Sequence, residues 1–179
     1  MPETTQETIE RVGLIPVLRA KNAAQAHAIV KAMIAGGVTV VEVTMTVPGA
    51  IGVLKELKHE YGSDLLLGSG TVTTAAQAEA TIEAGADYVK IFPCSAMGGA
   101  SYLKALLAPF PFLKLIPTGG VTVATAEDFL RAGARALGVG SDMVNLAAVE
   151  AGNPEKITDT ARAYLAILAR VREELAAKK

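Results

Sequence analysis

The chain is poor in cysteine, in net charge and in long apolar stretches, and each shortage excludes a class of protein. Cys94 stands alone, so an internal disulfide is excluded, which fits a reducing compartment and makes the cytoplasm the expected location. Lys and Arg number 17 against 18 Asp and Glu, and the net charge of -1 lacks the basic field that nucleic-acid binding needs. Residues 1–8 are polar and acidic, and no apolar run approaches the ~18 residues of a membrane span. We therefore expect no nucleic acid, no membrane, no signal peptide and no transmembrane helix.

Short runs rich in Val, Ile and Leu alternate along the chain with Ala-rich segments whose apolar residues recur at helical spacing. The runs are nearly continuous in apolar residues, as strands covered on both faces require. The predicted strands are 14–18, 38–46, 64–71, 88–92, 113–117 and 136–140. The predicted helices are 23–35, 50–61, 75–84, 100–107, 126–132 and 155–178. The sequence therefore predicts an α/β fold with a parallel sheet, built of six strand-helix units in a single domain, residues 1–179.

An internal repeat supports this architecture. Three predicted helices end in Ala-Gly-Gly or Ala-Gly-Ala at 35–37, 84–86 and 132–134 and lead directly into a strand. Residues 74–89 also resemble residues 122–137, so the repeating block is two strand-helix units long. Any parallel α/β protein reuses such turns, and the repeat therefore indicates a fold and no function.

Lys90 lies in the apolar run 88–92, where side chains alternate between the two faces of a strand. Tyr88, Lys90 and Phe92 then share one face, and Lys90 is expected to point into the interior of the fold. Apolar surroundings disfavour an ammonium ion and free the amine to attack a carbonyl, which makes Lys90 a candidate nucleophile. The strand alone fits equally a lysine at a sheet edge that reaches out to water.

Glu42 lies in a second apolar run, where it shares one strand face with Thr44 and Thr46. A carboxylate inside such a strand requires an explanation, because Glu is rarely buried without a partner. Next to Lys90 it could move protons during attack on a carbonyl. A purely structural ion pair between Glu42 and Lys90 explains the same pattern.

Polar residues and glycines stand at the carboxyl ends of other predicted strands: Arg19, Ser69-Gly70-Thr71, Thr118-Gly119-Gly120 and Gly140-Ser141. Parallel α/β folds build their sites at this end of the sheet, so these groups are expected to converge. The late glycines expose backbone N–H groups suited to a phosphate or carboxylate, although a tight turn explains either pair alone. Arg19 is suited to an anion or to a surface salt bridge.

Three other reactive residues receive no role. His27 and His59 fall within predicted helices away from these strand ends. Cys94 follows Lys90 closely, but it lacks the neighbouring ligands or histidine that metal or thiol chemistry requires. We therefore predict no metal site.

The motifs together resemble those of the class I 2-keto-3-deoxy-6-phosphogluconate and 4-hydroxy-2-oxoglutarate aldolases. The matching segments are Ile15-Pro16-Val17-Leu18-Arg19, Val41-Glu42-Val43-Thr44, Gly68-Ser69-Gly70-Thr71-Val72, Val89-Lys90-Ile91-Phe92-Pro93, Ile116-Pro117-Thr118-Gly119-Gly120-Val121 and Leu137-Gly138-Val139-Gly140-Ser141. They follow the family's order and span most of the chain. The combination of Lys-x-Phe-Pro with Pro-Thr-Gly-Gly is specific.

The resemblance implies a TIM-barrel-type parallel (β/α) fold and a carbon-carbon lyase without metal or cofactor. It implies that Lys90 forms a Schiff base with pyruvate and that Glu42 is the general acid-base. The implied ligands are a keto acid and an aldehyde, either glyceraldehyde 3-phosphate or glyoxylate, and the implied assembly is a homotrimer. Substrate contacts are implied for Arg19 and Thr71 at the keto-acid end, Phe92 and Thr118 along the chain, and Gly119, Gly120 and Ser141 at the phosphate or distal carboxylate.

The chain departs from the family in one respect. The family has eight strands, whereas this sequence passes from residues 81–87 directly into the lysine strand and has about six recognisable units. A deletion between equivalent helix turns would remove one repeat block in register, and an incomplete sequence is the other explanation. Six units are expected to leave an open sheet edge or to require an oligomer that covers it.

Three functions are compatible with these observations. The first is the aldolase. The second is a catalytically silent, aldolase-derived module whose role is oligomeric assembly. The third, another phosphate-binding barrel enzyme such as a phosphosugar isomerase, rests on the late glycines alone and has no use for Lys90 beside Glu42.

Overall fold

The computed structural model describes residues 4–44, 46–70, 89–109, 111–112 and 114–177, and each of the six predicted strands has a counterpart there. The strands are β1 (Leu14–Leu18), β2 (Val40–Thr44), β3 (Leu66–Gly70), β4 (Val89–Ile91), β5 (Leu115–Pro117) and β6 (Leu137–Val139). Five predicted helices are also confirmed: α2 (Ala23–Ala35), α3 (Ala50–Tyr61), α5 (Ala100–Leu107), α6 (Ala126–Arg131) and α8 (Glu155–Ala176). The predicted helix 75–84 lies outside the described residues.

Three short elements were not predicted: α1 (Thr5–Val12), the 3-10 helix η1 (Ser95–Met97) and α7 (Leu146–Glu150). The signal for α1 is present in the sequence as a capping box. The Thr4 hydroxyl accepts from Glu7 N, and the Glu7 carboxylate accepts from Thr4 N at 2.8 Å. Gly13, in the left-handed region at φ 70, ends this helix.

Among the described helices, none combines the length and apolar composition needed to cross a bilayer.

Every described strand pair is parallel, as the sequence predicts, but the strands form two sheets. The larger sheet has the order β3-β2-β1-β6, and the smaller one pairs β4 with β5. A bridge between Thr118 and Gly138 connects the end of β5 to β6. Within the described residues, the outer edges of β3 and β4 therefore have no strand partner. These two strands are the ones between which the sequence predicts missing units.

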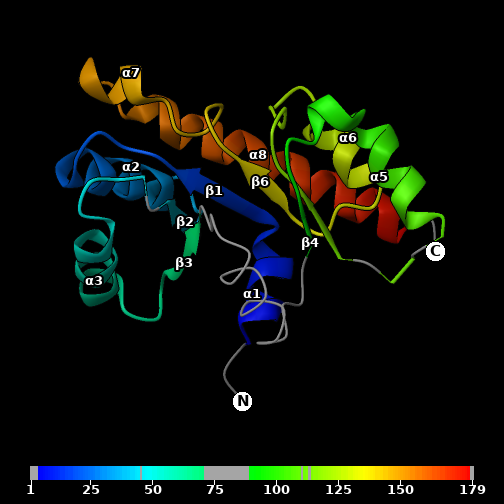
Figure 1. Cartoon of the computed structure of the whole chain (residues 1–179), viewed down its shortest axis with the longest axis horizontal. Helices are drawn as coiled ribbons and strands as arrows, with labels where there is room; N and C mark the ends of the chain where they lie inside the picture. The colour runs from blue at the N-terminus through cyan, green and yellow to red at the C-terminus, as the bar shows by residue number, and fades with distance from the viewer. Residues whose placement is uncertain (1–3, 45, 71–88, 110, 113, 178–179) are drawn as a thin grey trace.

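Apart from α1, which lies below β1 in Figure 1, most of the helices lie on one side of the strands, and α8 packs against both α2 and α6. The core lies between them and the outward face of the strands. Its largest fully buried side chains are Leu14, Leu18, Ile29, Met33, Leu57, Leu65, Leu103, Leu115, Leu137, Met143, Ile157 and Tyr164. These side chains fix the strands at the positions from which the polar residues project.

Arg172 joins the last helix to the start of the chain. Its guanidinium donates to the carbonyl oxygens of Arg11 at 2.6 Å, Glu10 and Arg135 at 3.4 Å. Two of these carbonyls belong to the last turn of α1, where a cation also interacts favourably with the helix dipole. Burial lowers the pKa of Arg172 from its ordinary value.

We expect Arg172→Ala to lower the free energy of unfolding by about 2–3 kcal/mol, because it removes charge-assisted hydrogen bonds to partly buried carbonyls. Arg162→Ala, on the same helix, removes an exposed ion pair with Asp159 and should cost about 0.5 kcal/mol or less. Urea denaturation of both variants measures the difference. Equal losses would show that Arg172 does not hold α1 in place.

Candidate active site

Lys90 and Glu42 meet across the interior of the fold, as their strand faces predict. Lys90 Nζ lies 3.2 Å from Glu42 Oε1 and 3.3 Å from Oε2. The two residues come from β4 and β2, which belong to different sheets. The contact therefore joins the two sheets. Its position along β1 is that of Val17, because Glu42 pairs in register with Val17.

The expected apolar burial of Lys90 is wrong. Its side chain is 42% exposed, whereas that of Glu42 is 17% exposed. Because β4 pairs only with β5 among the described strands, one flank of Lys90 is not covered by a neighbouring strand. The site thus contains an ion pair that water can reach, and an amine there needs a proton acceptor before it can act as a nucleophile. Glu42 is the acceptor within reach.

Thr44 and Thr46 share the strand face of Glu42, and their hydroxyls contact groups other than Lys90. The Thr44 hydroxyl donates to the carbonyl oxygen of Leu18 at 3.0 Å and lies 2.7 Å from the Thr46 hydroxyl. Thr44 is buried, and its bond connects the end of β2 to the end of β1. These hydroxyls therefore fix the strand ends beside Glu42.

A cavity of about 350 Å³ opens at the carboxyl ends of β1, β5 and β6. Six residues expected to contact substrate line it: Arg19, Phe92, Thr118, Gly119, Gly120 and Ser141. Their convergence confirms the position that parallel strands predict for these groups. The seventh, Thr71, lies outside the described residues. The sequence did not indicate the apolar wall of the cavity, formed by Val17, Val121, Val144 and Leu146.

Arg19 and Phe92 stand at the exposed rim of this cavity. Phe92 is 64% exposed. Arg19 is also exposed, and among the described residues it takes part in no ion pair, so the salt-bridge alternative finds no support there. Its guanidinium is available to an anion.

Two glycines allow close packing at the cavity: Gly120 lines it, and Gly138 lies against Thr118, which lines it. Gly120 has a φ of 77, and a Cβ placed on it would lie 2.4 Å from the Cβ of Ser95. A Cβ on Gly138 would lie 2.0 Å from the Thr118 hydroxyl oxygen. Larger residues would push the loops apart at both positions, so the glycines allow the close approach of backbone and side chain.

Thr118 is 5% exposed, and its hydroxyl has no hydrogen-bond partner among the described atoms. A buried hydroxyl without a partner is costly, and such groups in native proteins often serve a ligand. Because Thr118 lines the cavity, a ligand oxygen placed there could complete its bonding.

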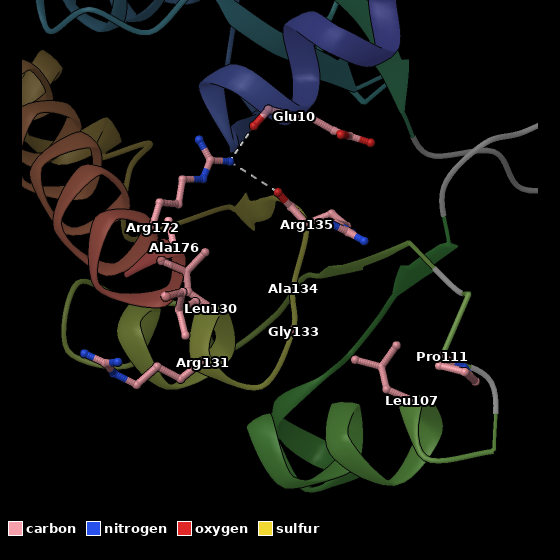
Figure 2. A pocket seen from close by; sticks show the side chains of 11 residues that line it. Glu10, Leu107, Pro111, Leu130, Arg131, Gly133, Ala134, Arg135, Arg172 and Ala176 are labelled. Carbon is pink, nitrogen blue, oxygen red and sulfur yellow. Dashed lines mark hydrogen bonds between the residues drawn. The ribbon is translucent and has the colours of Figure 1, made fainter. Parts of the chain in front are cut away.

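A larger cavity, about 640 Å³, lies at the opposite ends of the strands, beside Arg131, Arg135 and Arg172. Figure 2 shows that Arg172 is directed at the carbonyls of Glu10 and Arg135. Arg131 is paired with Glu127 and Glu174 on α6 and α8. Two of its three arginines thus bind other groups of the protein. Neither Lys90 nor Glu42 lines either cavity, but the smaller one is lined by Phe92, two residues after Lys90, and by Val17, which is in register with Glu42. We therefore place the candidate site at the smaller cavity.

Comparison with known proteins identifies the same motifs. A family model described as KDPG and KHG aldolase matches residues 5–89 and 85–160. The 2-dehydro-3-deoxy-phosphogluconate aldolase of Pseudoalteromonas atlantica is 29% identical, over 91% of this chain and 94% of that protein. The KHG/KDPG aldolase of Escherichia coli is 28% identical, over 89% and 94%. A KDPG aldolase structure from Legionella pneumophila, with pyruvate captured as a covalent carbinolamine, gives a TM-score of 0.75 at 25% identity and covers 90% of this chain and 98% of that one.

The alignments also locate the departure from these relatives. The alignment to the Pseudoalteromonas protein runs over 204 positions, more than the 179 residues of the chain, so it contains gaps opposite residues that this chain lacks. The two family segments meet at residues 85–89, directly before Lys90. That junction is where the sequence predicts the missing strand-helix units.

We expect Gly138→Ala to lower the free energy of unfolding by about 1–3 kcal/mol, because the new methyl group overlaps the Thr118 hydroxyl. Adding Thr118→Ala should recover part of this loss, since the two side chains compete for one space. Gly140→Ala is the control, because a Cβ there meets nothing within 4 Å. Additive losses in a denaturation cycle would show that Thr118 and Gly138 do not make this contact.

Proposed function

Because the chain belongs to the KDPG and KHG aldolase family, we propose that it is a class I aldolase with Lys90 as the Schiff-base lysine and Glu42 as the general acid-base. Its substrates are 2-keto-3-deoxy-6-phosphogluconate, 4-hydroxy-2-oxoglutarate or both. The observation that best supports this proposal is the 3.2 Å contact between Lys90 Nζ and Glu42. A nucleophile and its base must lie within hydrogen-bond reach, and this pair does.

The first steps form the imine. Glu42 takes a proton from the Lys90 ammonium, and the neutral amine attacks C2 of the keto acid to give a carbinolamine. Glu42 returns a proton to the carbinolamine oxygen, which leaves as water, and the nitrogen lone pair completes the protonated imine. Arg19 and Thr71 hold the keto-acid carboxylate during these steps by paired hydrogen bonds.

The imine then acts as an electron sink. Glu42, again a carboxylate, takes the proton of the C4 hydroxyl as the C3–C4 bond breaks, the aldehyde departs and the bonding electrons pass to the imine as an enamine; Glu42 then gives this proton to C3. Hydrolysis releases pyruvate and restores Lys90. Phe92 and Thr118 contact the substrate chain, while Gly119, Gly120 and Ser141 hold its phosphate or distal carboxylate. The cavity lined by five of these residues supports this placement.

The same proposal covers the organisation of the protein. Residues 1–179 form one aldolase-type domain that works without metal or cofactor, in the cytoplasm, on a keto acid and an aldehyde. Three chains associate as a homotrimer, as the family resemblance implies. Either glyceraldehyde 3-phosphate or glyoxylate is the aldehyde product.

One observation favours a second candidate function, a silent assembly module. Lys90 is more exposed than a Schiff-base lysine should be, and β3 and β4 each have an outer edge unpaired within the described residues. A chain that had lost catalysis could retain its helical surface for self-association. It would form a defined oligomer and no imine.

We expect incubation with pyruvate and borohydride to add one reduced pyruvyl group to the protein, seen by intact mass, because hydride reduces the imine irreversibly. Lys90→Arg keeps the cation beside Glu42 but cannot form an imine, and it should give no adduct. Glu42→Gln should slow adduct formation about 10²-fold or more, since it removes the proton acceptor.

Lys104→Ala, on the exposed face of α5, is the matched control and should form the adduct at the normal rate. Absence of an adduct on folded wild-type protein would rule out the aldolase and favour the assembly module.

We expect the protein to elute as a particle of three chains when its mass is measured by light scattering, because the fold leaves edges that association can protect. A monomer at micromolar concentration would contradict the trimer.

A further inference from the structure

A tyrosine of the last helix reaches the two loops that bear the glycines of the cavity. Tyr164 of α8 is fully buried, and its hydroxyl donates to Asp142 Oδ2 at 2.6 Å. The same carboxylate oxygen accepts the backbone N–H of Val123 at 3.1 Å. The Tyr164 oxygen also lies 3.4 Å from the carbonyl oxygen of Val121. One buried side chain and one carboxylate thus connect α8 with the loops after β5 and β6.

These loops are the ones that line the candidate cavity. Asp142 directly follows Ser141, and Val121 directly follows Gly120; Ser141, Val121 and Gly120 all face the cavity. The Thr125 hydroxyl adds a further restraint by donating to the carbonyl oxygen of Gly120 at 2.9 Å. The separation of Gly120 and Ser141 therefore depends on bonds made behind the cavity.

Packing alone does not account for the Tyr164 hydroxyl, because a phenylalanine would fill the same space without a buried polar atom. Burial and the neighbouring Asp142 raise the pKa of Tyr164, so the hydroxyl stays protonated and remains a donor. Asp142 is not among the residues that line the cavity, and its two hydrogen bonds hold the loops that carry Ser141 and Gly120.

We propose that Asp142 and Tyr164 are positioning residues of the distal anion subsite, holding the Gly119-Gly120 loop and Ser141 at the spacing that a phosphate requires. The inference rests on the proposed function for the identity of the substrate. The hydrogen bonds themselves are independent of it. Neither residue touches the substrate.

Binding of inorganic phosphate and of glycerol 3-phosphate to the full chain, measured by titration calorimetry, tests the proposal. Tyr164→Phe should weaken binding about five- to tenfold, because its hydrogen bond to Asp142 is lost, and Asp142→Ala should weaken it at least as much, because the bonds to both Tyr164 and Val123 are lost. Asp142→Asn keeps an acceptor oxygen and should recover most of the affinity. Pyruvate trapping at Lys90 should proceed at the wild-type rate in these variants.

Tyr61→Phe, at the end of α3, is the control for loss of a tyrosine hydroxyl and should leave phosphate binding unchanged. Unchanged phosphate binding in Tyr164→Phe would overturn the proposal. Equal losses of phosphate binding and of pyruvate trapping would also overturn it, because the pair would then be a general structural element. If the wild type traps no pyruvate, the proposed function fails, while the phosphate titrations still decide the role of Asp142 and Tyr164.

Discussion

Parallel pairing of the strands is the constraint on which the site depends. In a parallel sheet all carboxyl ends lie along one edge, and here that edge carries Arg19, Thr118, Gly119 and Ser141 from three separate strands. The same pairing sets the register that aligns Glu42 with Val17, so the carboxylate faces the interior. Residues far apart in the sequence become neighbours because the strands that carry them run in the same direction.

The sheet is interrupted at the position where this chain lacks units that its relatives have. The β3 and β4 strands flank the interruption, and the two family segments join just before β4. Three connections keep the halves together: the Thr118–Gly138 bridge, the contact of Lys90 with Glu42, and α8, which packs across α2 and α6. The core made by the remaining helices explains why the carboxyl ends stay aligned with a TM-score of 0.75 to a complete family member.

Sequence patterns predicted the elements that depend on local residues. The helices 23–35, 50–61 and 100–107 and the strand 14–18 have the predicted bounds, because continuous apolar runs and helical spacing identify them. Strand parity likewise placed Lys90 and Glu42 on facing sides. The exposure of Lys90 matches one of the two alternatives that its strand left open, and the choice between them depends on which strands flank β4. The hydrogen bond between Tyr164 and Asp142 depends on the placement of α8, which no local pattern indicates. The capping box of α1, in contrast, was legible and was overlooked.

The dependence on α8 has a consequence for the order of events during synthesis. A ribosome delivers the chain from its N-terminus, and domains generally fold as units as they emerge. Both Arg172, which binds the carbonyls of α1, and Tyr164, which holds the loops of the cavity, belong to α8, which is made after all the other described helices and strands. Until then, Ile29, Met33 and the other apolar residues of the core lack part of their cover. The nascent protein therefore passes through a period in which every strand is made and the fold is still open, and this is when a chaperone or a second chain can reach its interior.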